Sequence, residues 1–148
     1  MFKLIVAFSF SAMLAFCSAV SAADKKDGID EAFDLIPGEF SADVTLVNDY
    51  TFRGVSQTGG NPALQGTFVY SLGLQETFSA PVPVNIYGSV WGSNVNFGPA
   101  DPSYLELDWT IGINTELAGV SADFFAIWYT YPDTSGTGND YVEYAGGL

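Results

Sequence analysis

The stretch YLELDWTIGINTEL, residues 104–117, decides the fold class of this chain. Its side chains alternate strictly, with apolar residues at Leu105, Leu107, Trp109, Ile111 and Ile113, and polar or small residues at Glu106, Asp108, Thr110, Gly112, Asn114 and Glu116. An α-helix repeats every 3.6 residues and cannot separate the two sets in this way, whereas a strand repeats every two. The stretch therefore predicts a long β-strand with one apolar face and one polar face.

The same period of two extends in both directions along the chain. Further strands are predicted over residues 40–47, 63–75, 84–97, 120–131 and 141–148. Glycine and proline clusters separate most of them, and Ala118-Gly119 is a two-residue turn. The connection between the first two strands, within NDYTFRGVSQTGGNPALQG (residues 48–66), is predicted to be a tight polar loop. The expected fold is all-β and antiparallel.

Composition excludes several classes of function. The formal net charge is −13, so the chain has no basic patch for nucleic acid. It has no histidine and one cysteine, which rules out Ser-His-Asp and Cys-His catalysis and a His/Cys zinc site. Charged residues are 14% of the chain, against about 25% in an average soluble domain. We expect no enzyme, and nothing in the sequence calls for a cofactor.

The N-terminus has the three parts of a secretory signal peptide. A basic start at Lys3 is followed by an apolar segment over residues 4–16 and by small residues at 19–23. We predict a signal peptide over 1–22, an acidic tail over 23–39 and a single β domain over 40–148. The apolar segment is shorter than the roughly 20 residues of a membrane-spanning helix.

The predicted strands have the length and patterning of a transmembrane β-barrel. Several exceed the usual 5 to 6 residues, and a tilted membrane strand needs about 9 to 11. In that fold the apolar faces meet lipid and the polar faces line the lumen. The candidate lumen-facing residues are Asp43, Arg53, Glu106, Asp108 and Glu116. The candidates for an aromatic girdle are Trp91, Tyr104, Trp109, Tyr129 and Tyr131. The alternative is a soluble β-sandwich, in which the same two faces would be core and solvent.

Arg53 is the only cation beyond residue 26. One interpretation is a residue that lines a constriction and selects solutes. The other is a structural ion pair with an acidic residue such as Asp43, Asp49 or Glu106. Asp49 and Gln57 are expected to hold the same loop through side-chain hydrogen bonds.

Two further features invite a chemical interpretation. Glu106 and Asp108 share a strand face, near the separation that glycoside hydrolysis needs, but the sequence shows no substrate cleft. The segment NFGPADPSYLE, residues 96–106, offers oxygen ligands for calcium but lacks the EF-hand spacing. We therefore expect no hydrolase, and a solvated turn rather than a metal site.

The chain resembles the TorF-type porin family, also called the Gcw_chp family, whose members look like exported outer-membrane β-barrels. The resemblance rests on DYTFRGVSQTGGNPALQG, YGSVWGSNVNF, LELDWTIG, the IWYTYP region and YVEYAGGL, in this order over residues 40–148. It brings no catalytic or ligand residues. Family members are longer, and six strands are fewer than the roughly 8 of the smallest single-chain barrels. The barrel is therefore expected to be incomplete in this chain, with its C-terminal part missing.

The resulting expectation is an exported outer-membrane porin that passes small solutes or ions and prefers cations. Its partners would be outer-membrane lipid and its solutes, with a homo-oligomer left open. The alternative is a secreted or periplasmic β-sandwich that binds a ligand through exposed aromatic residues such as Trp91 and Trp128.

Overall fold

A computed structural model describes residues 35–132 and 139–148. Within it, Gly38–Leu148 forms one compact unit. The predicted signal peptide, most of the predicted acidic tail and residues 133–138 lie outside the described residues. The fold below is that of the compact unit.

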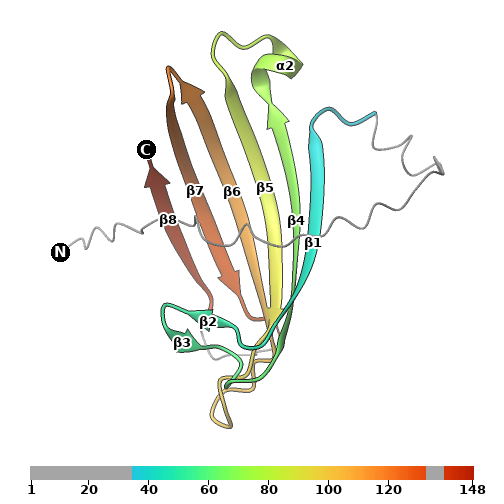
Figure 1. The fold of residues 1–148 in the computed structure, drawn as a ribbon, viewed down its shortest axis with the longest axis vertical. Coiled ribbons are helices and arrows are strands. Elements are labelled where there is room, and N and C mark those ends of the chain that lie inside the picture. Colours follow the sequence, from blue (N-terminus) through green and yellow to red (C-terminus); the bar gives the residue numbers. More distant parts are fainter. Residues whose placement is uncertain (1–34, 133–138) are drawn as a thin grey trace. The chain divides into compact units, whose positions relative to one another are not determined.

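Six strands form one antiparallel sheet in which each strand pairs with its neighbours along the chain (Figure 1). They are β1 (Glu39–Val47), β4 (Ala63–Gly73), β5 (Val84–Asn94), β6 (Leu105–Leu117), β7 (Val120–Thr130) and β8 (Tyr141–Gly147). The prediction of an all-β, antiparallel, up-and-down fold is confirmed, as are all six strands. The sheet is open, with β1 and β8 at its edges. Closure into a barrel therefore stays a prediction.

The connection between β4 and β5 contains a short helix that the alternation did not predict. The strand pattern was expected to continue to residue 75, but β4 ends at Gly73 and α2 (Leu74–Phe78) follows. Ser79, in the left-handed region at φ 54°, ends this turn, and its N–H donates to the carbonyl of Gln75. The segment LQETF consists largely of good helix formers, which explains the local change. No helix within the described ranges is long and apolar enough to cross a membrane.

Residues 48–62, which we call the hairpin segment, correct a second prediction. The expected loop contains a small hairpin of β2 (Thr51–Phe52) and β3 (Val55–Ser56). Arg53 and Gly54 form its turn, with φ angles of 50° and 83°. Two successive positive φ values define a type I′ turn, which matches the twist of paired strands.

The two faces of the sheet differ sharply in chemistry. Residues that oppose each other in neighbouring strands point to the same side, so each row across the sheet belongs to one face. The apolar face carries, among others, Val44, Leu46, Phe68, Trp109, Ile111, Ile113, Phe124, Trp128 and Val142, all of them exposed. The opposite face, the polar face, carries the buried side chains of Gln65, Ser93 and Glu106. Burial is thus reversed relative to a sheet that packs its apolar face into a core.

The small apolar core lies at one end of the sheet, on the polar face. Val95, Tyr129 and Tyr131 are buried there, and Tyr50 of the hairpin segment packs against them. The hairpin segment also pairs with the β5–β6 connection, since the N–H of Asn96 donates to the carbonyl of Gln57. Figure 1 shows β2 and β3 at the end of the sheet where β8 begins. The core therefore fastens the hairpin segment to the sheet.

Candidate functional site: the polar face of the sheet

One row of residues crosses the polar face from edge to edge. It runs in register through Asp43, Thr67, Trp91, Asp108, Tyr129 and Tyr141. Two predicted lumen-facing residues, Asp43 and Asp108, thus share a row, and Glu106 follows Asp108 on the same face of β6. Glu116 is exposed near the far end of β6, opposite Ser121, and is not part of this group.

Three of the five predicted girdle residues lie on the polar face. Trp91 and Tyr129 pair with Asp108 on either side, and the Tyr131 hydroxyl donates to Glu106 Oε1 at 3.1 Å. An outward position is wrong for these three, because the register gives Trp91 and Tyr129 the same face as the carboxylates and Tyr131 bonds to Glu106 on that face. Trp109 is exposed on the apolar face, and Tyr104 is exposed just before β6. A girdle stays a prediction for these two.

Asp49 organises the inside of the hairpin segment. Its Oδ1 accepts hydrogen bonds from Ser56 Oγ at 2.6 Å and from Thr58 Oγ1 at 2.7 Å. These bonds favour the ionised form and lower the pKa of the Asp49 carboxyl. The Gln57 amide donates to the carbonyl of Val55, as expected for a residue that holds this loop. The hairpin segment is therefore a defined structure that can present Arg53 in a fixed position.

Arg53 reaches across the polar face to the last strand of the sheet. Its Nη2 lies 2.7 Å and 2.9 Å from the two carboxylate oxygens of Glu143 in β8. The guanidinium also lies 4.7 Å from the ring centroid of Phe52. An ion pair was one of the two predicted roles, but the predicted partners Asp43, Asp49 and Glu106 are wrong, because register and the crossing of the hairpin bring Glu143 to it instead. The pair links the segment that follows β1 to the opposite edge strand.

Glu143 belongs to a cluster that sequence reasoning missed. The Tyr129 hydroxyl donates to Glu143 Oε2 at 3.2 Å, and the Tyr129 and Tyr141 rings stack with centroids 4.3 Å apart. Phe52 of the hairpin segment packs near Tyr129, with centroids 6.1 Å apart. The alternation in residues 141–148 could have placed Glu143 on the polar face, but nothing local links it to Arg53.

The carboxylates of Glu106 and Asp108 lie on the same face of the sheet as this cluster. Glu106 is 3% exposed, and Asp108 is partly buried. Within the described part of the chain, Glu106 Oε2 and Asp108 Oδ1 are buried without a hydrogen-bond partner. The phenol of Tyr50 is also partly buried nearby; burial first, and then the charges of Glu106 and Asp108, raise its pKa, so Tyr50 is neutral at physiological pH.

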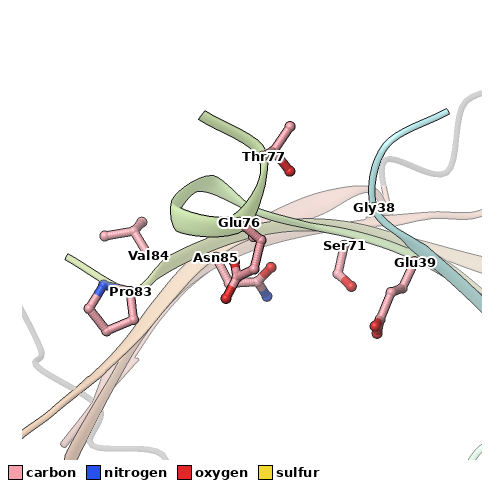
Figure 2. Close-up of a pocket in the computed structure, with 9 residues that line it drawn as sticks. Gly38, Glu39, Ser71, Glu76, Thr77, Pro83, Val84 and Asn85 are labelled. Carbon is pink, nitrogen blue, oxygen red and sulfur yellow. The ribbon is translucent and has the colours of Figure 1, made fainter. Parts of the chain in front are cut away.

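A cleft of about 540 Å³ opens on the sheet between β1, β4, α2 and the start of β5 (Figure 2). Glu39, Ser71, Glu76 and Asn85 contribute polar side chains to it, and no cation lines it. Glu76 folds back over Gly73, where a Cβ would collide with its carboxylate. The cleft is acidic, like the hairpin end of the polar face.

The expected turn over residues 96–106 is held by its own side chains. Asp101 accepts hydrogen bonds from the N–H and hydroxyl of Ser103 and from the Asn139 amide, and these bonds lower the pKa of its carboxyl. Among the residues the structure describes, no three acidic, histidine or cysteine side chains are grouped to hold a metal ion.

A family model for a bacterial protein of unknown function matches residues 31–148. The chain belongs to the Gcw_chp family. No curated protein and no solved structure matches it.

Membership of the Gcw_chp family confirms one half of the predicted resemblance. The family description names no activity, so the other half, a TorF-type porin, is not supported by the match. The match spans the whole sheet and the hairpin segment. Both are therefore features of the part of the chain that the family model recognises.

Proposed function

We propose that this Gcw_chp protein is an outer-membrane β-barrel of porin type that passes small solutes along its polar face. The observation that carries the proposal is the reversed burial of the sheet. Ile111 is 71% exposed on the apolar face, while Glu106 is 3% exposed on the polar face. A membrane barrel needs this arrangement, because its outer surface meets hydrocarbon and its interior is polar.

The strand lengths support the same proposal. Strands β4, β5 and β7 are 11 residues long each, and β6 is 13 residues long. A tilted membrane strand needs about 9 to 11 residues. The open edges at β1 and β8 must pair in a bilayer, since unpaired backbone groups are costly in hydrocarbon. Closure would need strands in addition to these six, from a continuation of the polypeptide or from a second copy.

The charges of the polar face support a preference for cations. Asp43, Glu106 and Asp108 lie on it, and the cation of the hairpin segment, Arg53, is already paired with Glu143. Rings of acidic side chains favour cation passage. We propose passive diffusion and no catalytic role for these carboxylates.

Fractionation and conductance test the proposal in two steps. The protein, expressed with its signal segment, should be recovered from the outer membrane in detergent and should migrate differently on gels before and after boiling. In a planar bilayer under a KCl gradient, its reversal potential should have the sign of potassium selectivity, and Asp43→Asn with Asp108→Asn should reduce that selectivity. Anion preference would refute the proposed cation preference, and the absence of conductance would refute the pore.

Recovery from the soluble periplasm or medium would favour the alternative, a secreted β-sandwich. That alternative requires a ligand surface of exposed aromatic residues. Trp128 lies on the apolar face and Trp91 on the polar face, so the two cannot share one surface on this sheet.

A further inference from the structure

The hairpin segment, residues 48–62, crosses the sheet from one edge strand to the other. It follows β1 along the chain, and its tip reaches β8, where Arg53 Nη2 lies 2.7 Å and 2.9 Å from the two carboxylate oxygens of Glu143. Strands β1 and β8 are the two edges of the main sheet (Figure 1). The segment therefore spans the full width of the sheet at one end of the polar face.

Two ring contacts hold the hairpin segment to the strands that lie between these edges. The ring of Tyr50 packs edge-on against Trp91 of β5, with centroids 5.2 Å apart. The ring of Phe52 packs near Tyr129 of β7, with centroids 6.1 Å apart. Trp91 and Tyr129 are both on the polar face, so the crossing follows that face from β1 through β5 and β7 to β8.

The base of the hairpin segment is fixed, and its tip is open to solvent. At the base, the N–H of Gln57 donates to the carbonyl of Tyr50 at 2.7 Å, and the N–H of Asn96 donates to the carbonyl of Gln57 at 2.7 Å. At the tip, the side chains of Arg53 and Glu143 are 55% and 31% exposed. The base thus sets the position of the hairpin, and two opposite charges meet at its exposed end.

We propose that the hairpin segment is the constriction of the pore, and that Arg53 and Glu143 set the charge at its narrowest point. This inference rests on the proposed function, in which the polar face lines the lumen. A segment that crosses this face from edge to edge occupies part of the lumen cross-section at that level. Because the two charges neutralise each other, the constriction is close to neutral, and the other carboxylates of the polar face supply the cation preference.

Substitution of either partner should change ion selectivity, in opposite directions. Arg53→Gln leaves the negative charge of Glu143 unpaired, and Glu143→Gln leaves the positive charge of Arg53 unpaired. A unit charge that ions pass within a few ångströms changes their relative permeability by up to about fivefold. In a planar bilayer under a KCl gradient, the ratio of potassium to chloride permeability should rise in Arg53→Gln and fall in Glu143→Gln. The double variant should have a ratio close to that of the unsubstituted protein.

Glu116→Gln is the matched control for Glu143→Gln, because it removes the same charge at a different level of the lumen. Glu143 is in register with Ile127, and Ile127 with Thr110, so Glu116 lies six positions further along β6. That separation is about 20 Å along a strand, and salt at 0.1 M screens charges beyond about 10 Å. The permeability ratio of this control should stay close to that of the unsubstituted protein. A decrease equal to that of Glu143→Gln would overturn the role of the hairpin tip.

A shortened hairpin tests the constriction by size. The hydrogen bond between Gln57 and Tyr50 already joins the two ends of residues 51–56, so Gly-Gly can replace these six residues with the base in place. Arg53→Gln is the matched control, because Arg53 is the only charged residue in the replaced stretch. Single-channel conductance should be higher in the shortened variant than in Arg53→Gln. Neutral polyethylene glycols that are excluded from the Arg53→Gln pore should enter the shortened one.

The outcomes separate this inference from the proposed function. If the unsubstituted protein conducts and the shortened variant conducts no better than Arg53→Gln, the pore stands and the constriction is overturned. If the unsubstituted protein does not conduct, the pore is refuted and the constriction with it. The single variants decide even where the shortened chain fails to fold, since shifts of the permeability ratio in the same direction in Arg53→Gln and Glu143→Gln would overturn the proposal.

Discussion

Arg53 occupies a backbone conformation that few residues with a side chain adopt. Its φ of 50° lies in the left-handed region, which costs a non-glycine residue roughly 1–2 kcal/mol. This backbone conformation directs the Arg53 side chain toward Glu143. The contacts of the Arg53 side chain are therefore offset in part by the conformational free energy of its positive φ, which a glycine at this position would not incur.

The ion pair between Arg53 and Glu143 should have a small effect on opening of the hairpin segment. Their side chains are 55% and 31% exposed, and such pairs contribute about 0–1 kcal/mol. Trypsin cleaves after lysine and arginine, and Arg53 is the only such residue beyond position 26. We predict that Glu143→Gln accelerates tryptic cleavage after Arg53 by up to about fivefold, the factor for 1 kcal/mol.

Glu116→Gln is the matched control, because it removes a carboxylate from the sheet without touching Arg53. Its cleavage rate should equal that of the unsubstituted protein. A rate in Glu143→Gln that matches this control would show that the ion pair does not restrain the hairpin segment.

The role of Arg53 could be predicted only in part from the sequence. A lone cation in an acidic chain predicts an ion pair, and one is present. Its partner could not be predicted, because Glu143 is 90 residues away and reaches Arg53 through the register of the six-stranded sheet. Glu106 and Asp108 could be assigned to one face from their spacing, but their burial depends on the hairpin segment above them.

At the scale of strands, glycine positions are matched to large neighbours across the sheet. Tyr87 of β5 lies opposite Gly112 of β6, and a Cβ on Gly112 would overlap the tyrosine ring. The ring can therefore lie over Gly112 while its hydroxyl donates to Asp123 Oδ1 at 3.1 Å in β7. One tyrosine thus connects three strands.

We predict that Gly112→Ala lowers the free energy of unfolding by about 1–3 kcal/mol, the usual cost of overfilling a packed site. Gly147→Ala in β8 is the control, because a Cβ there meets nothing within 4 Å. Urea unfolding followed by tryptophan fluorescence measures both. An unchanged midpoint in Gly112→Ala would mean that the Tyr87 ring moves away at no cost.

Strands were the most predictable elements of this chain. Alternation specifies which residues share a face, and it is clearest in β6, whereas β7 is apolar on nearly both faces. The hairpin of β2 and β3 was not predicted because its strands are two residues each and its turn is Arg-Gly rather than Asn-Gly or Asp-Gly. The α2 turn was missed because Leu72 and Leu74 extend the period of two into a segment that folds as a helix.

At the scale of the whole domain, alternation cannot say which face is buried. That depends on what covers each face, and here the hairpin segment covers one end of the polar face. The same sequence pattern fits a barrel in lipid and a sheet in a soluble sandwich. A charged substitution on the apolar face can distinguish whether that face meets lipid or belongs to a soluble sheet.

Ile111→Arg is such a substitution, because its expected effect on stability differs between water and a bilayer. At a 71% exposed position in water, the substitution should change stability by no more than about 0.5 kcal/mol. In the middle of a bilayer, arginine costs about 2–4 kcal/mol. We predict the larger loss when unfolding is measured in lipid vesicles, and a clearly smaller loss for Thr110→Arg, its neighbour on the polar face. Equal effects at the two positions would contradict a lipid-facing apolar surface.

The path of the hairpin segment also has a consequence for the order of folding. Every pairing in the main sheet joins strands that are neighbours along the chain, so the sheet can grow one hairpin at a time. The contact between Arg53 and Glu143 instead spans 90 residues, and contacts across long loops carry the largest closure entropy. Its formation therefore requires β8 to be docked already, which makes it a late kinetic event. Residues 51–56 would complete their attachment to the sheet only after the last strand has joined it.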